Sequence, residues 1–411
     1  MEHIKSEAFD MFKDNQTKDF NKDLVKVEML SNTLIWLEDW IENNNPEQLN
    51  DSYDIESWMN EEMIEMIEIY LSCSFKKIST KEDCKDVLRS LVYEYARFRQ
   101  NLALDYARQR SEKEGHKIVK RILETPQTTQ KTKEWKSESL NLLTGHEFAD
   151  VVYGSEKMRG AVIAKKCSPL TEYPEQTCYI TPSDGKLSPF KWGWRYEPVV
   201  KSIFEKYAAK GIINDNIGRI KHSSLARLAA SPDGLITSGP FAGHLVEIKS
   251  PISRVLDYKI PLNYWCQMQL QAEVCDVDIV EYVEIRFESV PINKDIESWL
   301  KKPFKENIPK MFGVICVVGK EGDYNSNRYV YSEPFESIKD FMNYKPKYEK
   351  DEKIFELCAY RVLDYHHKSV LRNKKWWELV GKPAYEEFWI DVDEAKKSGK
   401  MIKHEVLFLD D

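Results

Sequence analysis

The chain has 411 residues, which is enough for two or three compact domains of about 150 residues each. With 42% hydrophobic and 31% charged residues, the composition excludes wholesale disorder and collagen-like or low-complexity classes. The formal net charge is −8, so any nucleic-acid site must be a local cluster of cations within an acidic protein.

Two features of the sequence bear on its compartment. The start, MEHIKSEAFDMF, lacks the charged leader and apolar core of a signal peptide, and no apolar run reaches the roughly 18 residues of a membrane span. The eight cysteines are scattered without a CxxC pair, which favours free thiols over a zinc ribbon or an iron–sulfur cluster. We therefore expect an intracellular protein in a reducing compartment, with no membrane partner.

The first region, residues 1–125, is predicted to be helical. Apolar residues recur at spacings of three and four over residues 30–41, 59–71 and 83–123, as they do on one face of an amphipathic helix. Residues 126–130 interrupt this periodicity and are predicted to form a linker.

The second region, residues 126–335, mixes helix and strand signals and is predicted to be an α/β or α+β core. Helices are expected at 196–209 and 262–273, and strands at 244–249, 279–286, 311–318 and 328–331. This order predicts a central mixed sheet flanked by helices. Residues 336–411 are predicted to form a C-terminal helical extension and tail, with 354–367 as its clearest helix.

Two carboxylates in the middle region are placed to meet. Asp233 lies in Ser-Pro-Asp-Gly, and Glu247 follows it by 14 residues, which leaves room for a turn and a return strand. Paired carboxylate oxygens bind Mg²⁺ or Mn²⁺. Lys249, two residues further along the strand, faces the same side as Glu247 and puts an ammonium beside such a site.

Taken alone, these residues are compatible with a metal site or with a simple structural role. Glu-x-Lys also occurs at 134–136 and 394–396, where a solvated charge pair is the simple interpretation. Pro-Asp-Gly occurs once and favours an ordinary turn in any case. A carboxylate between Val246 and Ile248, on a strand that is otherwise apolar, needs a partner or a metal.

The ordered set of motifs within residues 135–287 resembles the PD-(D/E)xK nucleases. S-P-D-G followed by V-E-I-K-S-P resembles their signature, and the flanking motifs resemble the lambda-exonuclease-like group. The flanking motifs are W-G-W-R-Y-E-P at 192–198, N-Y-W-C-Q-M-Q-L-Q at 263–271 and L-L-T-G-H at 142–146. Given its length and N-terminal helical region, the chain is most similar to viral, baculovirus-type alkaline nucleases.

The resemblance implies a restriction-endonuclease-like core and a role for each matching residue. Asp233 and Glu247 would bind the metals together with the carbonyl of Ile248, and Glu197 would complete the site from its helix. Lys249 would position the attacking water.

The resemblance also implies a cofactor and a glutamine. The cofactor would be Mg²⁺ or Mn²⁺, with two ions per site, and water would attack a DNA phosphodiester in line. Gln267 is our choice for the glutamine of the last motif, and Gln269 is kept beside it because the facing of the helix is not fixed by sequence.

Candidate substrate-binding residues surround these motifs, and each also has a plain structural interpretation. The upstream motif has His146 where the family has Ser, and Ser139 where we expect Arg, which weakens the expectation of a 5′-phosphate site. Cations nearby would replace the missing groups or simply form a solvated loop, and aromatics would stack on unpaired bases or pack in the core. The candidates are Thr144, His146, Arg159, Lys165, Lys166, Trp194, Ser231 and Tyr264.

The expected function is that of a Mg²⁺-dependent deoxyribonuclease, a 5′→3′ exonuclease on double-stranded DNA, with endonuclease activity left open. By resemblance it would serve viral DNA replication and recombination beside a single-strand-binding annealing protein, in the host nucleus. Two alternatives stay open, a nuclease acting mainly on RNA in host mRNA decay and a non-catalytic DNA-binding recombination scaffold. The sequence does not predict the oligomeric state.

Overall fold

A computed structural model describes residues 82–130, 132–168 and 187–398. The helices predicted at 30–41 and 59–71 lie outside the described residues. No helix within the described ranges is long and apolar enough to span a membrane.

The chain divides into two compact units, and one comprises Met1–Ala107 with Asn373–Val380. Its described part holds the start of α5 (Glu82–Glu124), α13 (Lys374–Trp376) and most of the π-helix η5 (Trp377–Gly381). Asn373 caps α13, because its side-chain oxygen accepts a 2.8 Å hydrogen bond from the backbone N–H of Trp376. The long helix α5 confirms the helix predicted for 83–123.

The other unit comprises Arg108–Arg372 and Gly381–Asp411 and contains the α/β core. Its helical elements after α5 are α6 (Lys133–Glu138), η3 (Ser139–Asn141), α7 (Gly145–Val152), α8 (Glu156–Cys167), α9 (Pro189–Phe204), η4 (Glu205–Ala209), α10 (Leu262–Cys275), α11 (Ile296–Leu300), α12 (Ile338–Asn343) and α14 (Lys382–Ser398). Its strands are β1 (Gln127–Thr128), β2 (Ile213–Asn214), β3 (Arg219–Lys221), β4 (Ala229–Ala230), β5 (Gly234–Ile236), β6 (Leu245–Lys249), β7 (Ile279–Pro291), β8 (Phe312–Lys320), β9 (Asp323–Tyr331) and β10 (Lys353–Leu371).

Seven strands form one mixed sheet in the order β2-β5-β6-β7-β10-β8-β9. Only the β6–β7 pair of this sheet is parallel, and α10 makes the crossover between these two strands. A small second sheet pairs β1, β3 and β4. This mixed sheet with flanking helices confirms the predicted fold class.

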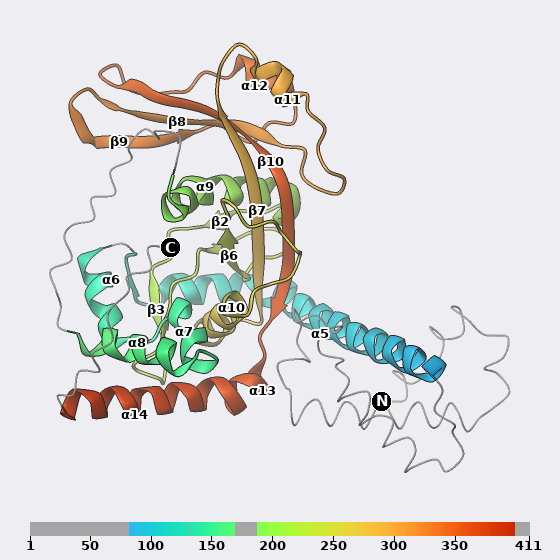
Figure 1. Cartoon of the computed structure of the whole chain (residues 1–411), viewed down its shortest axis with the longest axis vertical. Helices are drawn as coiled ribbons and strands as arrows, with labels where there is room; N and C mark the ends of the chain where they lie inside the picture. The colour runs from blue at the N-terminus through green and yellow to red at the C-terminus, as the bar shows by residue number, and fades with distance from the viewer. Residues whose placement is uncertain (1–81, 131, 169–186, 399–411) are drawn as a thin grey trace. The chain divides into compact units, whose positions relative to one another are not determined.

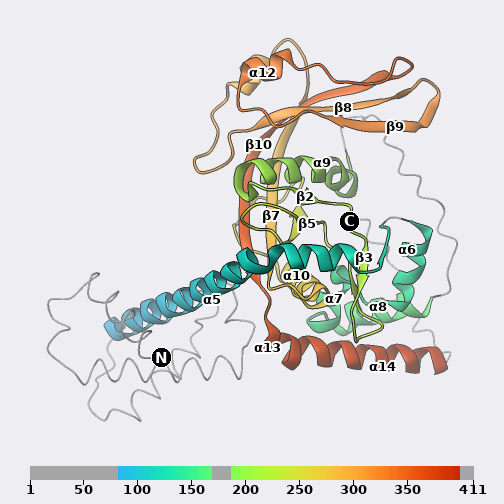
Figure 2. The ribbon, with the colours of Figure 1, turned by 180° about the vertical axis from the view of Figure 1, so that it is seen from behind.

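The helices α9 and α10 cover opposite faces of the sheet at β6 (Figure 1). Apolar residues of α9, including Val200 and Ile203, pack with Val246, Ile248 and Val283 in the main core. Because side chains alternate along a strand, Glu247 and Lys249 point to the other face, toward α10. Figure 2 shows the same layering from behind.

The strand β10 corrects the predicted helix at 354–367. It spans 19 residues and lies between β7 and β8, antiparallel to both. Residues such as Cys358, Tyr360 and Val362 are buried in the main core from this central position. The strand thus belongs to the central sheet although it lies beyond residue 335.

The predicted linker at 126–130 is also wrong. Gln127 and Thr128 form β1 and pair with Ile220 and Arg219 of β3. The break in helical periodicity marks the entry into a sheet, and this segment reaches the candidate active site.

Candidate active site

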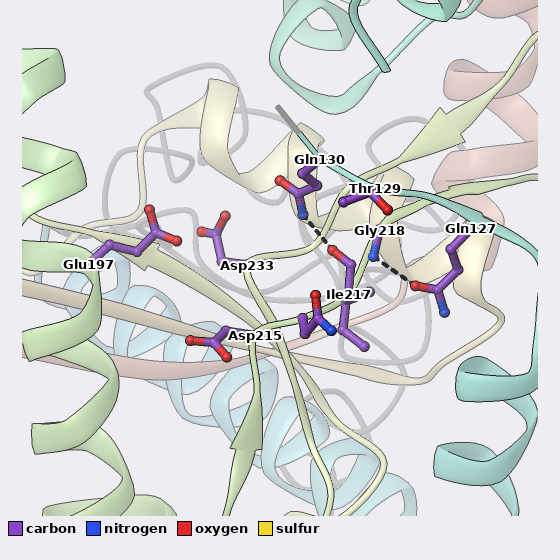
Figure 3. Close-up of a pocket in the computed structure, with 9 residues that line it drawn as sticks. Gln127, Thr129, Gln130, Glu197, Asp215, Ile217, Gly218 and Asp233 are labelled. Carbon is purple, nitrogen blue, oxygen red and sulfur yellow. Dashed lines mark hydrogen bonds between the residues drawn. The ribbon is translucent and has the colours of Figure 1, made fainter. Parts of the chain in front are cut away.

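A cavity of about 290 Å³ opens between α9, the start of β5 and the segment around β1. Its wall includes three carboxylates, Glu197, Asp215 and Asp233. Figure 3 shows the carboxylates of Glu197 and Asp233 facing each other across this space. Two of the predicted metal-binding residues are therefore brought together by the fold.

Asp233 stands directly before β5, in the turn that leads into the β5–β6 hairpin. Its Oδ2 accepts a 2.8 Å hydrogen bond from the backbone N–H of Ile248 on β6. Burial, and then the neighbouring carboxylates of Glu247 and Glu197, raise the pKa of the Asp233 carboxyl well above its usual range. The surroundings of Asp233 therefore disfavour the negatively charged form of its carboxyl.

Glu247 and Lys249 form a close pair on the α10 face of β6. The Glu247 side chain is fully buried, and its Oε1 lies 2.6 Å from Nζ of Lys249. Burial opposes the charge on Lys249, but Glu247 and Asp233 outweigh it and raise the pKa of the ammonium. Lys249 is therefore charged at neutral pH, as a group that offsets negative charge must be.

Helix α10 presents a polar stripe to this pair. Gln271 donates from Nε2 to Oε2 of Glu247 at 2.7 Å, and Lys249 Nζ lies 4.4 Å from the ring centroid of Tyr264. Gln267, four residues before Gln271, shares this stripe. Its Cγ would lie only 2.7 Å from a Cβ placed on Gly145, so the glycine lets the first turn of α7 approach α10 closely.

The prediction for Gln269 is wrong in its facing. Its buried amide donates to the backbone carbonyl of Leu371 on β10 at 2.8 Å. Gln271, which sequence reasoning did not select, contacts Glu247 instead. The helical period was the available signal, because residues 264, 267 and 271 fall on one stripe while 269 does not.

The donor set fits a hard divalent cation. Among the described residues, no three His, Cys, Asp or Glu side chains form a ready-made metal site. Burial, and then the carboxylates of Glu247 and Glu197, nevertheless raise the pKa of Asp233, and a cation would relieve the repulsion that these two neighbours exert on it. Carboxylate and carbonyl oxygens are the ligands that Mg²⁺ and Mn²⁺ prefer.

The upstream motif forms a compact charged cluster at the start of α7. Thr144, the N-cap residue, donates to Oε2 of Glu147 at 3.4 Å and lies 3.2 Å from Nδ1 of His146. Lys165 and Lys166 approach Glu147 at 2.8 and 2.5 Å. Burial opposes the charge of Glu147, but His146 and these lysines lower the pKa of its carboxyl to about 2.

Lys166 is not available for DNA, so that prediction is wrong. Its side chain is 0% exposed, and Nζ also donates to the backbone carbonyls of Ser139 and Leu142 at 2.8 and 2.9 Å. The ammonium of Lys166 therefore holds the backbone before α7 in place through the carbonyls of Ser139 and Leu142. His146 and Lys165 are the exposed members of this cluster, with 64% and 42% of their side chains exposed.

The other predicted substrate-binding residues have partners within the protein. Arg159 pairs with Asp391 of α14, and Ser231 accepts a 3.2 Å hydrogen bond from Nε1 of Trp135. Trp194 packs against the exposed Phe190, with ring centroids 4.3 Å apart. DNA contacts by Lys165, Arg159, Ser231 and Trp194 stay predictions.

Two parts of the cavity wall were missed by sequence reasoning. Asp215, after β2, pairs with Lys201 of α9 at 2.9 Å. Gln127 and Gln130 line the opposite wall. No motif marks these residues, since Asp215 reaches the cavity through the pairing of β2 with β5, and Gln127 and Gln130 reach it through the pairing of β1 with β3.

Comparisons with known proteins bear on the same region. Residues 134–278, about a third of the chain, match the family model of the YqaJ-like viral recombinase domain. No curated protein matches the chain.

Two similar solved structures are crystal structures of an alkaline exonuclease, LHK-Exo from Laribacter hongkongensis, one of them in complex with dAMP. Each is 15% identical to this chain, and the match covers 65% of this chain and 98% of that chain, with TM-scores of 0.36 and 0.35. The family match confirms the resemblance predicted for the central region, while the finer likeness to baculovirus-type enzymes stays a prediction. Residues 134–278 are therefore similar to the YqaJ-like viral recombinase domain.

Proposed function

We propose that this protein is a Mg²⁺-dependent deoxyribonuclease that digests double-stranded DNA from its 5′ ends. One observation carries the proposal. Asp233, its pKa raised by burial and then by Glu247 and Glu197, lies beside a charged Lys249 held 2.6 Å from Glu247. A non-catalytic scaffold gains nothing from such mutually repelling groups, whereas hydrolysis of a phosphodiester needs them.

Each group has a distinct task in this proposal. Asp233, Glu247 and Glu197 hold the cation, together with the backbone carbonyl of Ile248. When bound, Mg²⁺ supplies Lewis-acid stabilisation of charge on the phosphate oxygens. Lys249 orients the attacking water and offsets negative charge that develops at phosphorus.

Gln271 and Tyr264 support this arrangement from α10. The amide of Gln271 fixes one oxygen of Glu247, so the other oxygen stays directed at Lys249. The ring of Tyr264 lies against the ammonium and restricts its position. Lys249 is thus oriented before substrate arrives, which lowers the cost of reaching the transition state.

The end of the DNA is proposed to be held at the start of α7. Thr144 and the exposed His146 stand there, next to Gln267 of the α10 stripe. A hydroxyl, an imidazole and the helix N-terminus are suited to a terminal phosphate. This arrangement supports a preference for 5′-phosphorylated ends.

The test compares Asp233→Asn and Lys249→Met with the wild type on end-labelled duplex DNA in Mg²⁺, and DNA binding is measured in Ca²⁺. Both variants should bind DNA and fail to degrade it. Lys310→Met, at an exposed position, is the matched control and should digest DNA like the wild type. Degradation by Lys249→Met at the control rate would rule out the proposed site.

The same assay separates the alternatives. Labelled RNA of the same sequence tests an RNA preference, and a wild-type chain that binds DNA without cleaving it would support a scaffold. Duplexes with 5′-phosphate or 5′-hydroxyl ends test the role of Thr144 and His146.

The biological setting is part of the proposal. We place the protein in viral DNA replication and recombination, beside a single-strand annealing protein, in a reducing intracellular compartment such as the host nucleus. The family match to viral recombinases supports the first point, and the buried thiols of Cys275 and Cys316, which form no disulfide, support the last. Co-purification of an annealing protein from infected cells would test the partner.

A further inference from the structure

The segment Gln127–Gln130 is built into the wall of the cavity. Gln127 accepts a 2.7 Å hydrogen bond at Oε1 from the backbone N–H of Gly218, and its Nε2 donates to the carbonyl of Ile122 at 2.8 Å. A Cβ on Gly218 would lie 2.7 Å from the carbonyl oxygen of Thr128, so only glycine lets the two segments come this close. The position of Gln130 in the cavity is therefore fixed by its neighbours.

The amide of Gln130 joins two backbone segments that carry the site. Its Nε2 donates to the carbonyl of Ile217 at 2.7 Å and to that of Pro232 at 3.2 Å. Figure 3 shows Gln130 reaching toward Ile217, with Asp233 beside them. One NH₂ group has two N–H donors, so it can serve both carbonyls at once.

The bond to Pro232 acts directly on Asp233. The Pro232 carbonyl belongs to the peptide plane that leads into Asp233, so holding this oxygen holds the backbone nitrogen and Cα of Asp233. On the other side, the carboxylate itself is held by the N–H of Ile248. Asp233 is thus fixed at both ends, by β6 and by Gln130.

The neutrality of this donor matters in a cavity lined by Glu197, Asp215 and Asp233. A lysine or arginine at position 130 would serve the same carbonyls but would compete with a divalent cation for the carboxylates. A glutamate would have no N–H to donate. An amide satisfies the carbonyls without changing the charge of the site.

We propose that Gln130 is a positioning residue for Asp233, holding the Pro232–Asp233 peptide in the orientation that cation binding and hydrolysis need. The inference rests on the proposed function. It makes the segment before α6 part of the active site, although the known sequence motifs begin after it.

The experiment compares Gln130→Leu and Gln130→Glu with the wild type and with Gln109→Glu, a matched control at an exposed position of α5. Kinetics on duplex DNA give kcat, KM and the half-saturating Mg²⁺ concentration. Thermal unfolding with and without Mn²⁺ gives the rise in melting temperature that cation binding causes.

We expect kcat to fall about 10- to 100-fold in both Gln130 variants, since small displacements of a reacting group have effects of this order. KM for DNA should stay near the wild-type value. Gln130→Leu should also need more Mg²⁺ for half-maximal rate and should lose most of the Mn²⁺-induced rise in melting temperature. Gln109→Glu should match the wild type in every measurement.

A purely structural role predicts a different pattern, in which the melting temperature without cation falls while kcat and the Mn²⁺-induced rise persist. That pattern, or a wild-type kcat in both Gln130 variants, would overturn the inference. If the wild type itself fails to cleave DNA, the proposed function is wrong. The Mn²⁺-induced rise in melting temperature then still tests the positioning role of Gln130. An equal rise in wild type and Gln130→Leu counts against the positioning role, and a rise lost only in the variant supports it.

Discussion

Two carboxylates of the central sheet region, Glu281 and Asp233, have opposite surroundings. Glu281 of β7 lies 2.7 Å from His244 Nδ1, 2.7 Å from His367 Nε2, and accepts a 2.8 Å hydrogen bond from Ser369. Burial opposes its charge, yet these donors outweigh burial and lower the pKa of Glu281 far below its usual range. Asp233, directly before β5, instead lies near the carboxylates of Glu247 and Glu197, and burial together with these neighbours raises its pKa.

The two surroundings distinguish a carboxylate that stabilises the fold from one that is suited to binding a ligand. A buried carboxylate stabilises the fold when both of its oxygens accept hydrogen bonds, because its negative charge is then balanced within the protein. Carboxylates that face one another across a cavity destabilise the fold by repulsion. Such groups are typical of sites where a bound ligand compensates that repulsion. We therefore expect substitutions at the two places to separate activity from stability.

The largest expected effect is on activity at Asp233. Asp233→Asn should lower kcat by a factor of about 1,000 or more, because the cation loses a charged ligand. Its free energy of unfolding should stay level or rise by about 1 kcal/mol, since the repulsion with Glu247 and Glu197 is removed. Parallel kinetics and urea unfolding would check this, and a clear loss of stability would contradict the comparison.

The converse result is expected at Glu281. Glu281→Gln should lower the free energy of unfolding by about 3 kcal/mol, because the buried donors around it lose a charged acceptor. Activity per folded molecule should stay within about twofold of the wild type. Denaturant titration combined with rates below the unfolding transition would reveal any hidden catalytic role.

Glu147 extends the comparison to the upstream motif through its pH dependence. Its pKa is about 2 in the folded protein against an ordinary value of 4.5, so the stability it contributes is complete above pH 4.5 and is lost as the pH falls toward 2. Glu147→Gln should lose about 3 kcal/mol at neutral pH and should show a flatter acid profile. Melting temperatures from pH 7 to pH 3 would measure both effects, with parallel profiles counting against the assignment.

The smallest expected effect separates two glutamines of one helix. Gln271→Leu should lower kcat about tenfold by freeing one oxygen of Glu247, a change of about 1.4 kcal/mol in the barrier. Gln269→Leu should leave kcat unchanged and lower stability by about 1 kcal/mol, through its lost bond to Leu371. Reversal of the two results would mean that α10 presents its other face to the substrate.

Much of the site could be predicted because its chemistry is local in sequence. Asp233, Glu247 and Lys249 lie within one hairpin, where strand alternation fixes which side chains share a face. Glu197 follows from its motif and from a helix with a clear apolar side. These residues needed no knowledge of distant contacts.

The failures come from long-range structure. Residues 354–367 have apolar spacings that suit a helix, and only their place between β7 and β8 makes them a strand. Lys166 looks like a surface cation until its ammonium is found on carbonyls of the segment before α7. Gln130 reaches the cavity through the pairing of β1 with β3, and Asp215 through the pairing of β2 with β5, and no local sequence pattern predicts either pairing.

The position of β10 has a consequence for the order of events during protein synthesis. This strand is made after β7, β8 and β9, yet it lies between β7 and β8 in the finished sheet. A nascent chain that ends before residue 353 would expose the edges of β7 and β8, which invites association with other strands. The β8–β9 hairpin can form early, but the sheet closes only when contacts spanning residues 279–371 are made, so folding of this domain is expected to be late and slow.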